Sequence, residues 1–371
     1  MTGPARASGR ACVGAGVLLV AATIALIASG ASQPPISLPP GFRLDEFAVG
    51  LGPARALTVD PAGVVLVSVP AAGRVLALPD RDGDGRADDF VVVAAGLDLP
   101  HGLAFHRGAL YVAETGRVVR FTYDPARLVA RDSRVVVPDL PAGEHHWTRS
   151  IAFGPDGRLY VAIGSSCDAC RERDRRRAAI IRYEADGSGE RLFATGLRNP
   201  VGLAFHPATG RLWTTVNERD WKSGGAPPDH VTAVREGGDY GWPDCFAAAG
   251  TFRPDPELAE PRSCRDFVLP SLELSPHSAP LGAVFYTGRQ FPAAYQGSLF
   301  VALHGSRPEL PPAGYKIVRV EVESGRPPVV HDFATGFRAW GRPVDLAVGR
   351  SGSLFISDDH RGAVYRVSYR R

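Results

Sequence analysis

The chain has 371 residues, of which 44% are apolar and 22% charged, so it is long and apolar enough to build a sizeable core. This composition excludes disorder of the whole chain, and a net charge of +3 with scattered arginines gives no reason to expect a nucleic-acid partner. The 42 glycines and 32 prolines follow no collagen-like period, which predicts many turns and therefore many short strands.

The N-terminus has the pattern of a targeting segment. Arg6 and Arg10 precede an uncharged apolar run over residues 11–28, and small residues follow it up to Ala31. We predict that residues 1–31 are a signal peptide, removed during export to the periplasm or the exterior. The run is also just long enough for an uncleaved membrane anchor, which stays as the alternative and would be the chain's one membrane contact.

An acidic segment, DRDGDGRADDF, spans residues 80–90. Position 12 of a calcium loop that starts at its first residue would be Val91, so the bidentate acid of an EF-hand is missing. Two interpretations stay open, a structural calcium loop between strands and an ordinary acidic hairpin turn. The side chains at loop positions 1, 3, 5 and 9 are those of Asp80, Asp82, Asp84 and Asp88.

One element recurs six times between residues 60 and 358: a turn with glycine, then an alternating apolar strand, and often a second strand. A unit of about 50 residues cannot bury its small sheet alone, and radial packing of four-stranded blades solves this problem. We therefore predict an all-β, six-bladed β-propeller over residues 32–371, with a long insertion where one spacing is larger. A pair of stacked β-sheets would not explain six copies. The repeated glycines are Gly63, Gly108, Gly157, Gly210, Gly297 and Gly352.

Cysteine usage agrees with export. Cys12 would leave with the signal peptide, and four cysteines remain, which allow three pairings. We favour the local pairs Cys167–Cys170 and Cys245–Cys264, because each closes a short loop in an oxidising compartment. A single CxxC is a weak zinc signal, and CDACR lacks the histidine of a c-type haem site.

Polar residues precede three of the repeated strand pairs, where the loops of a propeller converge on its channel. His145, His146 and Trp147 precede the third copy, and Arg198 and Asn199 precede the fourth. His277 precedes a strand that leads to the fifth copy. These are the candidate site residues.

Five segments in order resemble the glucose/sorbosone dehydrogenase family, and the resemblance extends over about residues 40–369. Members of this family are six-bladed propellers that use pyrroloquinoline quinone and calcium to oxidise sugars. The five segments are HHWTRSIAFGPDGRLYVAIGSSCDAC (145–170), GLRNPVGLAFHP (196–207), GGDYGWPDC (237–245), HSAPLGAVFY (277–286) and WGRPVDLAV (340–348).

The resemblance implies a role for each matching residue. His146 stands at the position of the general base, which takes the hydroxyl proton of the sugar, with His145 as the less suited neighbour. Arg198 and Asn199 match the pair that contacts the quinone, where a guanidinium can stabilise developing negative charge. The alternatives are a polar loop residue for His146 and a salt bridge between blades for Arg198.

Further cofactor contacts are implied around the fourth copy. Asn217 would supply an amide and Asp229 an acidic partner, while the backbone carbonyls of Glu218 and Arg219 would face a catalytic calcium ion. Relatives more often have glycine where Glu218 stands, so its carboxylate is a candidate ligand too, or the site is altered. The last implied cofactor-facing side chains, each with a structural alternative, are those of His277 and Arg342.

The sequence thus predicts a secreted or periplasmic quinoprotein that oxidises an aldose or a sorbosone-like sugar aldehyde. The chain has no haem motif, so an external acceptor would reoxidise the quinone. One alternative is a calcium-dependent lactonase of the six-bladed kind, which needs carboxylate and amide ligands in the channel. The other is a non-catalytic propeller that binds glycans or a protein.

Overall fold

The computed structural model describes residues 1–3, 34–143, 145–220, 225–260, 264–308, 310–323 and 325–370. Nearly all of the predicted signal peptide, including Cys12, lies outside these residues. Within them, no helix has both the length and the apolar character needed to cross a membrane.

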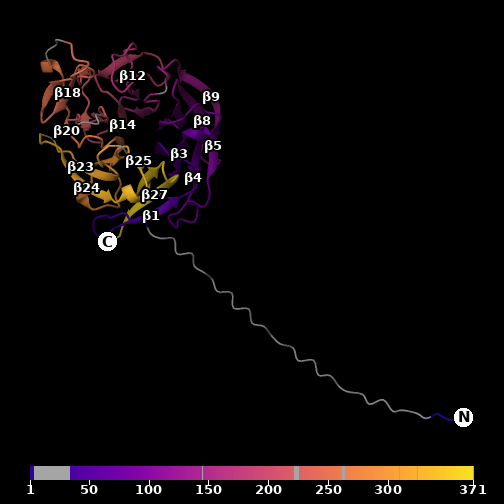
Figure 1. The fold of residues 1–371 in the computed structure, drawn as a ribbon. Coiled ribbons are helices and arrows are strands. Elements are labelled where there is room, and N and C mark those ends of the chain that lie inside the picture. Colours follow the sequence, from indigo (N-terminus) through magenta and orange to yellow (C-terminus); the bar gives the residue numbers. More distant parts are fainter. Residues whose placement is uncertain are drawn as a thin grey trace. The chain divides into compact units, whose positions relative to one another are not determined.

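The predicted propeller is confirmed, because six small antiparallel sheets surround a central channel and the sequence runs from blade to blade (Figure 1). Apart from short 3₁₀ turns, the described residues contain no helix. Blades 1 to 3 are β2 (Leu57–Val59), β3 (Val65–Val69), β4 (Arg74–Leu78) and β5 (Val91–Ala95); β6 (Leu103–His106), β7 (Ala109–Ala113), β8 (Val118–Asp124) and β9 (Val129–Val137); and β10 (Arg149–Phe153), β11 (Leu159–Ile163), β12 (Ala179–Tyr183) and β13 (Arg191–Thr195).

The sixth blade joins the two ends of the propeller chain. Its outer strand is β1, which pairs antiparallel with β27, and Figure 1 shows indigo β1 beside yellow β27. The sequence did not predict this strand, because it stands alone before the first repeat. Blades 4 to 6 are β14 (Pro200–Phe205), β15 (Leu212–Val216), β16 (His230–Ala233) and β20 (Leu272–Glu273); β21 (Pro280–Phe285), β22 (Leu299–Leu303), β23 (Lys316–Glu321) and β24 (Val329–Thr335); and β25 (Pro343–Val348), β26 (Leu354–Asp358), β27 (Ala363–Tyr369) and β1 (Phe42–Ala48).

The repeated strand of the sequence is the second strand of every blade, and it is buried on both faces. All five residues of β3, β7, β11, β15, β22 and β26 are buried. The expected alternation between buried and exposed positions is therefore wrong for these strands. Each blade lies between two others, so both faces of its second strand pack against a neighbour, as Phe300 of blade 5 and Ile356 of blade 6 do in one core cluster.

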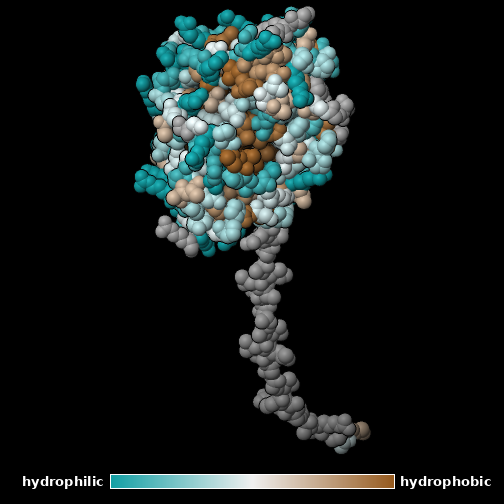
Figure 2. Space-filling model, turned by 90° about the vertical axis from the view of Figure 1, so that its left-hand side faces the viewer, coloured by the Kyte–Doolittle hydropathy of each residue, from teal (hydrophilic) through white to brown (hydrophobic). Residues whose placement is uncertain are grey.

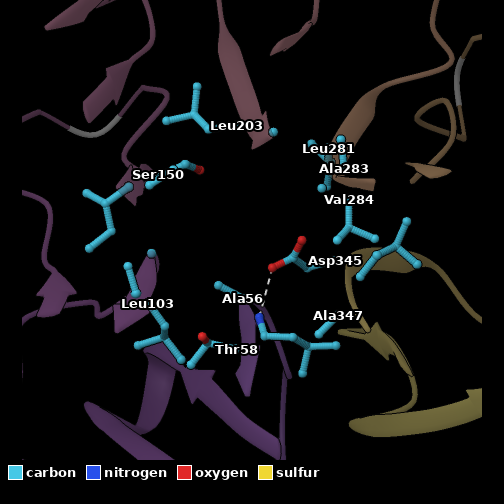
Figure 3. Close-up of a pocket in the computed structure, with 18 of the residues that line it drawn as sticks. Ala56, Thr58, Leu103, Ser150, Leu203, Leu281, Ala283, Val284, Asp345 and Ala347 are labelled. Carbon is cyan, nitrogen blue, oxygen red and sulfur yellow. Dashed lines mark hydrogen bonds between the residues drawn. The ribbon is translucent and has the colours of Figure 1, made fainter. Parts of the chain in front are cut away.

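The first strand of each blade lines the channel, which holds a cavity of about 320 Å³ (Figure 3). Neighbouring inner strands approach closely: a Cβ on Gly202 would lie 2.4 Å from the carbonyl oxygen of Leu281. At the equivalent position of blade 6, Asp345 accepts a hydrogen bond from the backbone N–H of Leu57 at 2.8 Å. Asp345 thus links the last blade to the first.

The predicted insertion lies between β16 and β20 of blade 4. It adds β17 (Gly238–Asp239) as a parallel fifth strand to blade 3 and forms a hairpin of β18 (Cys245–Ala248) and β19 (Thr251–Pro254). The predicted disulfide Cys245–Cys264 is confirmed and joins this hairpin to the 3₁₀ turn Cys264–Asp266. The insertion therefore packs along two blades.

Figure 2 shows the side of the propeller that lies on the left in Figure 1. Hydrophilic side chains cover most of this face, and hydrophobic side chains are exposed in patches between them. Among the described apolar residues, Val329 and Val330 of β24 are well exposed. Such scattered exposure is normal for a folded domain and needs no partner to explain it.

Candidate active site

A cavity of about 260 Å³ lies where the inner strands of blades 3 to 6 begin. Its lining residues come from six connections between strands that are far apart in sequence, as the propeller topology predicts. Its lining includes the sequence-predicted residues His146, Arg198, Asn199, Asn217, Glu218, Asp229, His277 and Arg342. It also includes three charged or titratable residues that the sequence analysis missed, Asp220, His304 and Arg307.

His146 is held in one orientation. Its backbone has φ of 45°, a left-handed value that is unusual for a residue with a side chain, and its carbonyl accepts a hydrogen bond from buried Arg149 at 2.9 Å. The ring nitrogen Nδ1 lies 3.0 Å from the carbonyl oxygen of Ser165. Because a carbonyl only accepts, Nδ1 carries the proton and Nε2 of the neutral ring keeps a free lone pair.

Burial and the nearby charge of Arg198 lower the pKa of His146 to about 2. The imidazole is therefore neutral near pH 7, which suits a group that accepts a proton. Gly164 makes room for this arrangement, since a Cβ there would lie 2.3 Å from Oδ1 of Asn199 and 2.8 Å from Cβ of His146.

Arg198 uses most of its five N–H donors within the protein. Nε and Nη2 donate to the carbonyl and the carboxylate of Asp168, at 3.1 and 2.7 Å, and Nη1 donates to the carbonyls of Asn217 and Glu218, at 3.1 and 2.7 Å. One N–H of Nη2 stays available to a ligand. Arg198 therefore does form an ion pair between loops of two blades, and it still lines the cavity.

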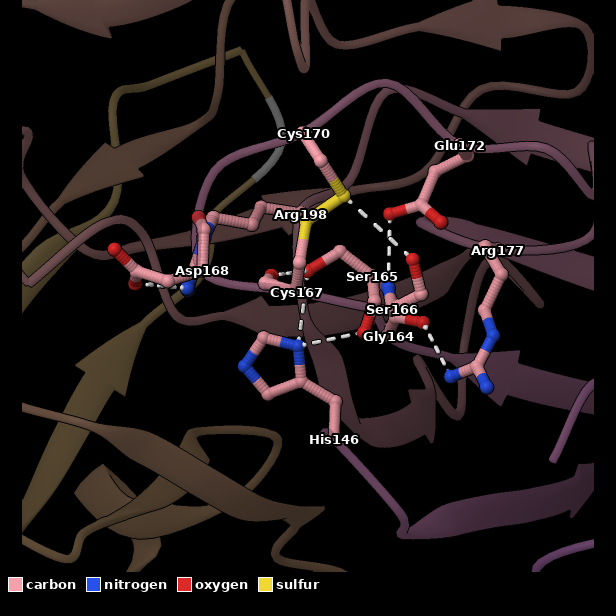
Figure 4. The surroundings of a disulfide bond; sticks show 10 residues. All are labelled: His146, Gly164, Ser165, Ser166, Cys167, Asp168, Cys170, Glu172, Arg177 and Arg198. Atoms are coloured by element: carbon pink, nitrogen blue, oxygen red, sulfur yellow. Dashed lines mark hydrogen bonds and ion pairs between the residues drawn. A yellow bond between two sulfur atoms is a disulfide. The ribbon is translucent and has the colours of Figure 1, made fainter. Parts of the chain in front are cut away.

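The disulfide Cys167–Cys170 closes a loop that contacts both His146 and Arg198 (Figure 4). The hydroxyl of Ser165 donates to the carbonyl of Cys167 at 2.7 Å and lies 2.9 Å from Nδ1 of His146. Asp168, inside the disulfide loop, holds Arg198. This predicted disulfide is confirmed, and its loop contacts two residues that line the cavity.

Asn199 and Trp242 flank Arg198 with unsatisfied polar atoms. Oδ1 of Asn199 is buried and has no hydrogen-bond partner among the described residues. The guanidinium of Arg198 lies over the ring of Trp242, 5.5 Å from its centre, so the YGWP segment of the insertion reaches the site. A buried acceptor without a partner indicates that a ligand supplies the missing donor.

Two buried acids line the cavity. The carboxylate of Asp229 accepts hydrogen bonds from the backbone N–H groups of Glu218 and Ala279, both at 2.8 Å, and so holds two loops together. Burial raises the pKa of Glu218 to about 8 and that of Asp229 to about 7. Oε1 of Glu218 lies 3.7 Å from Nδ1 of His230, and burial keeps His230 neutral by lowering its pKa to about 3.

Arg219 does not line the cavity. Its buried side chain forms ion pairs with Asp255 at 2.6 Å and Glu257 at 3.0 Å in the insertion. The predicted role of its backbone carbonyl as a calcium ligand stays a prediction. For Glu218 the corresponding carbonyl accepts a hydrogen bond from Arg198.

The other two implied cofactor residues are fixed by their neighbours. Nδ1 of His277 lies 3.1 Å from the carboxylate of Asp220, which also lies 3.5 Å from Nε of Arg307. Arg342 of blade 6 donates to the carbonyls of His304 and Gly305 at 3.3 and 2.6 Å.

The acidic segment 80–90 lies between β4 and β5, far from this cavity in sequence. Ligand atoms of Asp80, Asp82 and Asp84 lie within 4.8 Å of one another; Asp82 and Asp84 are exposed, whereas Asp80 is half-buried and its Oδ1 is buried. Asp88 accepts a hydrogen bond from the backbone N–H of Arg81 at 2.8 Å. The calcium and hairpin interpretations of this loop both stay predictions.

Residues 36–370 match the TrAA12-like protein family, and this match covers nearly the whole propeller. The chain belongs to the TrAA12-like family.

Relatives of this TrAA12-like chain include sugar dehydrogenases. It is 25% identical to an uncharacterized protein of Borreliella burgdorferi over 91% of each chain. It is 26% identical to a pyrroloquinoline quinone-dependent pyranose dehydrogenase of Coprinopsis cinerea, over 91% of this chain but only 55% of that protein. It is 24% identical to a pyrroloquinoline quinone-dependent sugar dehydrogenase of Hypocrea jecorina, over 88% and 87% of the two chains.

Solved structures confirm the fold of the TrAA12-like chain. It superposes on a Trichoderma reesei protein of carbohydrate-active enzyme family AA12 with a TM-score of 0.79 and 23% identity, covering 91% of this chain and 98% of that one. It also superposes on the holo form of the pyrroloquinoline quinone domain of the Coprinopsis cinerea pyranose dehydrogenase. The TM-score is 0.76 and the identity 23%, covering 92% of this chain and 99% of that one.

Proposed function

We propose that this chain is a quinoprotein sugar dehydrogenase that uses pyrroloquinoline quinone and calcium to oxidise an aldose or a related, sorbosone-like sugar aldehyde. One observation carries the proposal: a neutral, oriented His146 and a partly free Arg198 line the same buried cavity. The pyrroloquinoline quinone-dependent relatives support it.

The cavity residues fit the quinone. The cofactor carries three carboxylates, and three arginines line the cavity: Arg198, Arg307 and Arg342. The buried, unpartnered Oδ1 of Asn199 would accept a hydrogen bond from the pyrrole N–H of the quinone or from a hydroxyl of the sugar. Asn217, Asp229 and His277 would complete the walls around it.

When bound, the quinone supplies the two-electron acceptor for the hydride of the sugar. His146 takes the hydroxyl proton on Nε2, because its Nδ1 proton is held by Ser165. Arg198 stabilises negative charge that develops in the cavity, and its four internal hydrogen bonds keep it in place. Burial of these groups strengthens their electrostatic interaction.

Calcium would bind beside the loop of Glu218 and Arg219. The backbone carbonyls of these residues, or the carboxylate of Glu218, offer the oxygen ligands that calcium prefers. Glu218 lines the cavity, and burial raises its pKa to about 8, so a bound cation would favour its ionised form.

The chain would act outside the cytoplasm. Two disulfides form, which is typical of an oxidising compartment, and the predicted signal peptide agrees with it. An external acceptor would then reoxidise the quinone.

Addition of pyrroloquinoline quinone and calcium to the purified chain tests the proposal. We expect saturable quinone binding and dye reduction with at least one member of a panel of aldoses. Absence of quinone binding would rule the proposal out. Calcium-dependent ester hydrolysis without quinone binding would favour the lactonase, and binding of glycans or a protein without turnover would favour the non-catalytic propeller.

A further inference from the structure

A second histidine lines the cavity and is held as firmly as His146. His304 follows β22, at the position where Asn217 follows β15. Its backbone N–H donates to the carbonyl of Ala279 at 3.0 Å, and its own carbonyl accepts from Arg342. Only 15% of its side chain is exposed.

Asp359 and Arg55 fix the ring of His304. Nε2 of His304 lies 3.0 and 3.2 Å from the two carboxylate oxygens of Asp359, and Asp359 also pairs with Nη1 of Arg55 at 2.6 Å. Burial lowers the pKa of His304, whereas the hydrogen bond from His304 and the charge of Arg55 lower the pKa of Asp359 against the effect of burial. The carboxylate is therefore ionised and the neutral ring donates its Nε2 proton to it.

This tautomer leaves Nδ1 of His304 as an acceptor. Among the described residues Nδ1 has no hydrogen-bond partner, and it is not fully buried. His304 lines the cavity, so a ligand bound there can approach this nitrogen. The rim of the quinone consists almost entirely of carboxylate and carbonyl oxygens, which are acceptors themselves. A sugar presents hydroxyl donors, so it suits an acceptor nitrogen better.

We propose that His304, held by Asp359 and Arg55, determines sugar specificity by accepting a hydrogen bond on Nδ1 from a second hydroxyl of the substrate. This inference rests on the proposed dehydrogenase function. His146 would take the proton of the hydroxyl that is oxidised, and His304 would bind a hydroxyl that is not. Sugars that lack this hydroxyl, or carry it in the other configuration, would be oxidised more slowly.

Two substitutions separate the two nitrogens of the ring. His304→Gln keeps a donor near the Nε2 position and loses the acceptor at Nδ1, whereas His304→Asn keeps an oxygen near Nδ1 and loses the contact with Asp359. Asp359→Asn tests the positioning role, because an amide no longer requires the proton on Nε2. His331→Gln is the matched control, since His331 is an exposed histidine on β24.

The experiment compares kcat/KM for an aldose and for its set of single deoxy analogues. We expect His304→Gln to lose about tenfold with the parent sugar and to show no further loss with one deoxy analogue, which is itself about tenfold poorer with the unchanged chain. His304→Asn should lose less, Asp359→Asn should raise KM more than it lowers kcat, and His331→Gln should match the unchanged chain. The quinone Kd and the Tm should change little in His304→Gln.

The same sugar profile in His304→Gln and the unchanged chain would overturn the inference while leaving the dehydrogenase intact. A tenfold rise in the quinone Kd without a change in sugar selectivity would overturn it too, because His304 would then contact the cofactor. Failure of the unchanged chain to bind quinone would overturn both the proposed function and this inference.

Discussion

Blades 2 and 4 each have a buried glutamate just after their second strand, and the two glutamates differ in their hydrogen-bond and charge partners. Glu114 follows β7, and its two oxygens accept from the backbone N–H of Asp98 at 2.6 Å and from Arg117. Glu218 is the second residue after β15, lies 3.7 Å from neutral His230 and lines the cavity. The acid at the rim of blade 2 is therefore paired within the protein, whereas the acid at the rim of blade 4 borders the space for a ligand.

Among the residues that line the cavity, substitution of His146 should have the largest effect on activity. We expect His146→Ala to lower kcat by about a thousandfold, because the sugar proton loses its acceptor, while quinone binding changes little. Quinone affinity is measured by titration and turnover by dye reduction. Equal loss of quinone binding and turnover would contradict the role of His146 as base.

Substitution of Arg198 should weaken binding and turnover together. We expect Arg198→Ala to raise the quinone Kd by about a hundredfold and to lower kcat, because both the anion contact and the support of the Glu218 carbonyl are lost. Arg117→Ala on blade 2 is the control and should leave quinone binding unchanged. An Arg198→Ala variant with normal quinone affinity would place Arg198 in a structural role.

The two glutamates can be compared directly. Glu218→Gln should weaken calcium binding about tenfold in calorimetric titration and leave the fold intact. Glu114→Gln should leave calcium binding unchanged and lower the free energy of unfolding by about 1–3 kcal/mol, because Arg117 loses its charged partner. Unchanged calcium binding in Glu218→Gln together with weaker binding in Glu114→Gln would contradict the different roles of the two glutamates.

Removal of each disulfide should affect a different property, quinone binding for Cys167–Cys170 and thermal stability for Cys245–Cys264. Replacing Cys167 and Cys170 by serine should weaken quinone binding about fivefold, because Asp168 loses the loop that aims it at Arg198. Replacing Cys245 and Cys264 should lower Tm with little change in quinone affinity, since this disulfide lies in the insertion. The same change in quinone affinity in both variants would show that neither loop is specific to the site.

The last prediction concerns the pH dependence of stability at His101, which lines the channel cavity and whose pKa is lowered to about 3 by burial and the charge of Arg55. The unfolded chain binds a proton there below its pKa of about 6.5 and the folded chain does not, so stability falls as the pH drops from 6.5 towards 3. Between pH 7 and 4.5 the unchanged chain should lose about 2 kcal/mol more than His101→Gln in urea unfolding. The same pH dependence of the unfolding free energy in the unchanged chain and in His101→Gln would contradict the lowered pKa of His101.

The sequence predicted most of the fold because each blade repeats one pattern. The glycine turn and the apolar strand after it occupy the same position in all six blades. The six copies of this motif, of which HPATGRLWTTV is one, therefore predict the second strand of every blade. It could not predict β1, because this strand has no repeat of its own and is recognised only by its pairing with β27. Nor could it predict that β17 of the insertion joins blade 3.

The site was partly predictable for a similar reason. His146, Arg198 and Asn199 precede inner strands and match a family pattern, so their convergence could be expected. His304 carries a signal that was overlooked: VALH ends as TTVN does, with a polar residue directly after the second strand. Asp359 carries the same signal, because it directly follows β26. Its pairing with Arg55 could not be predicted, because that pairing depends on the contact between the last blade and the first.

The pairing of β1 with β27 also bears on how the chain acquires its fold. β1 is the first propeller strand along the sequence and β27 the last, so Leu44 and Phe47, both buried in the folded structure, lack a partner strand until all six blades have been synthesised. Blades 1 to 5 can form in order, but the ring cannot close before β27 has been made. Until then two apolar side chains of β1 stay exposed, and the unclosed ring is the aggregation-prone stage of folding.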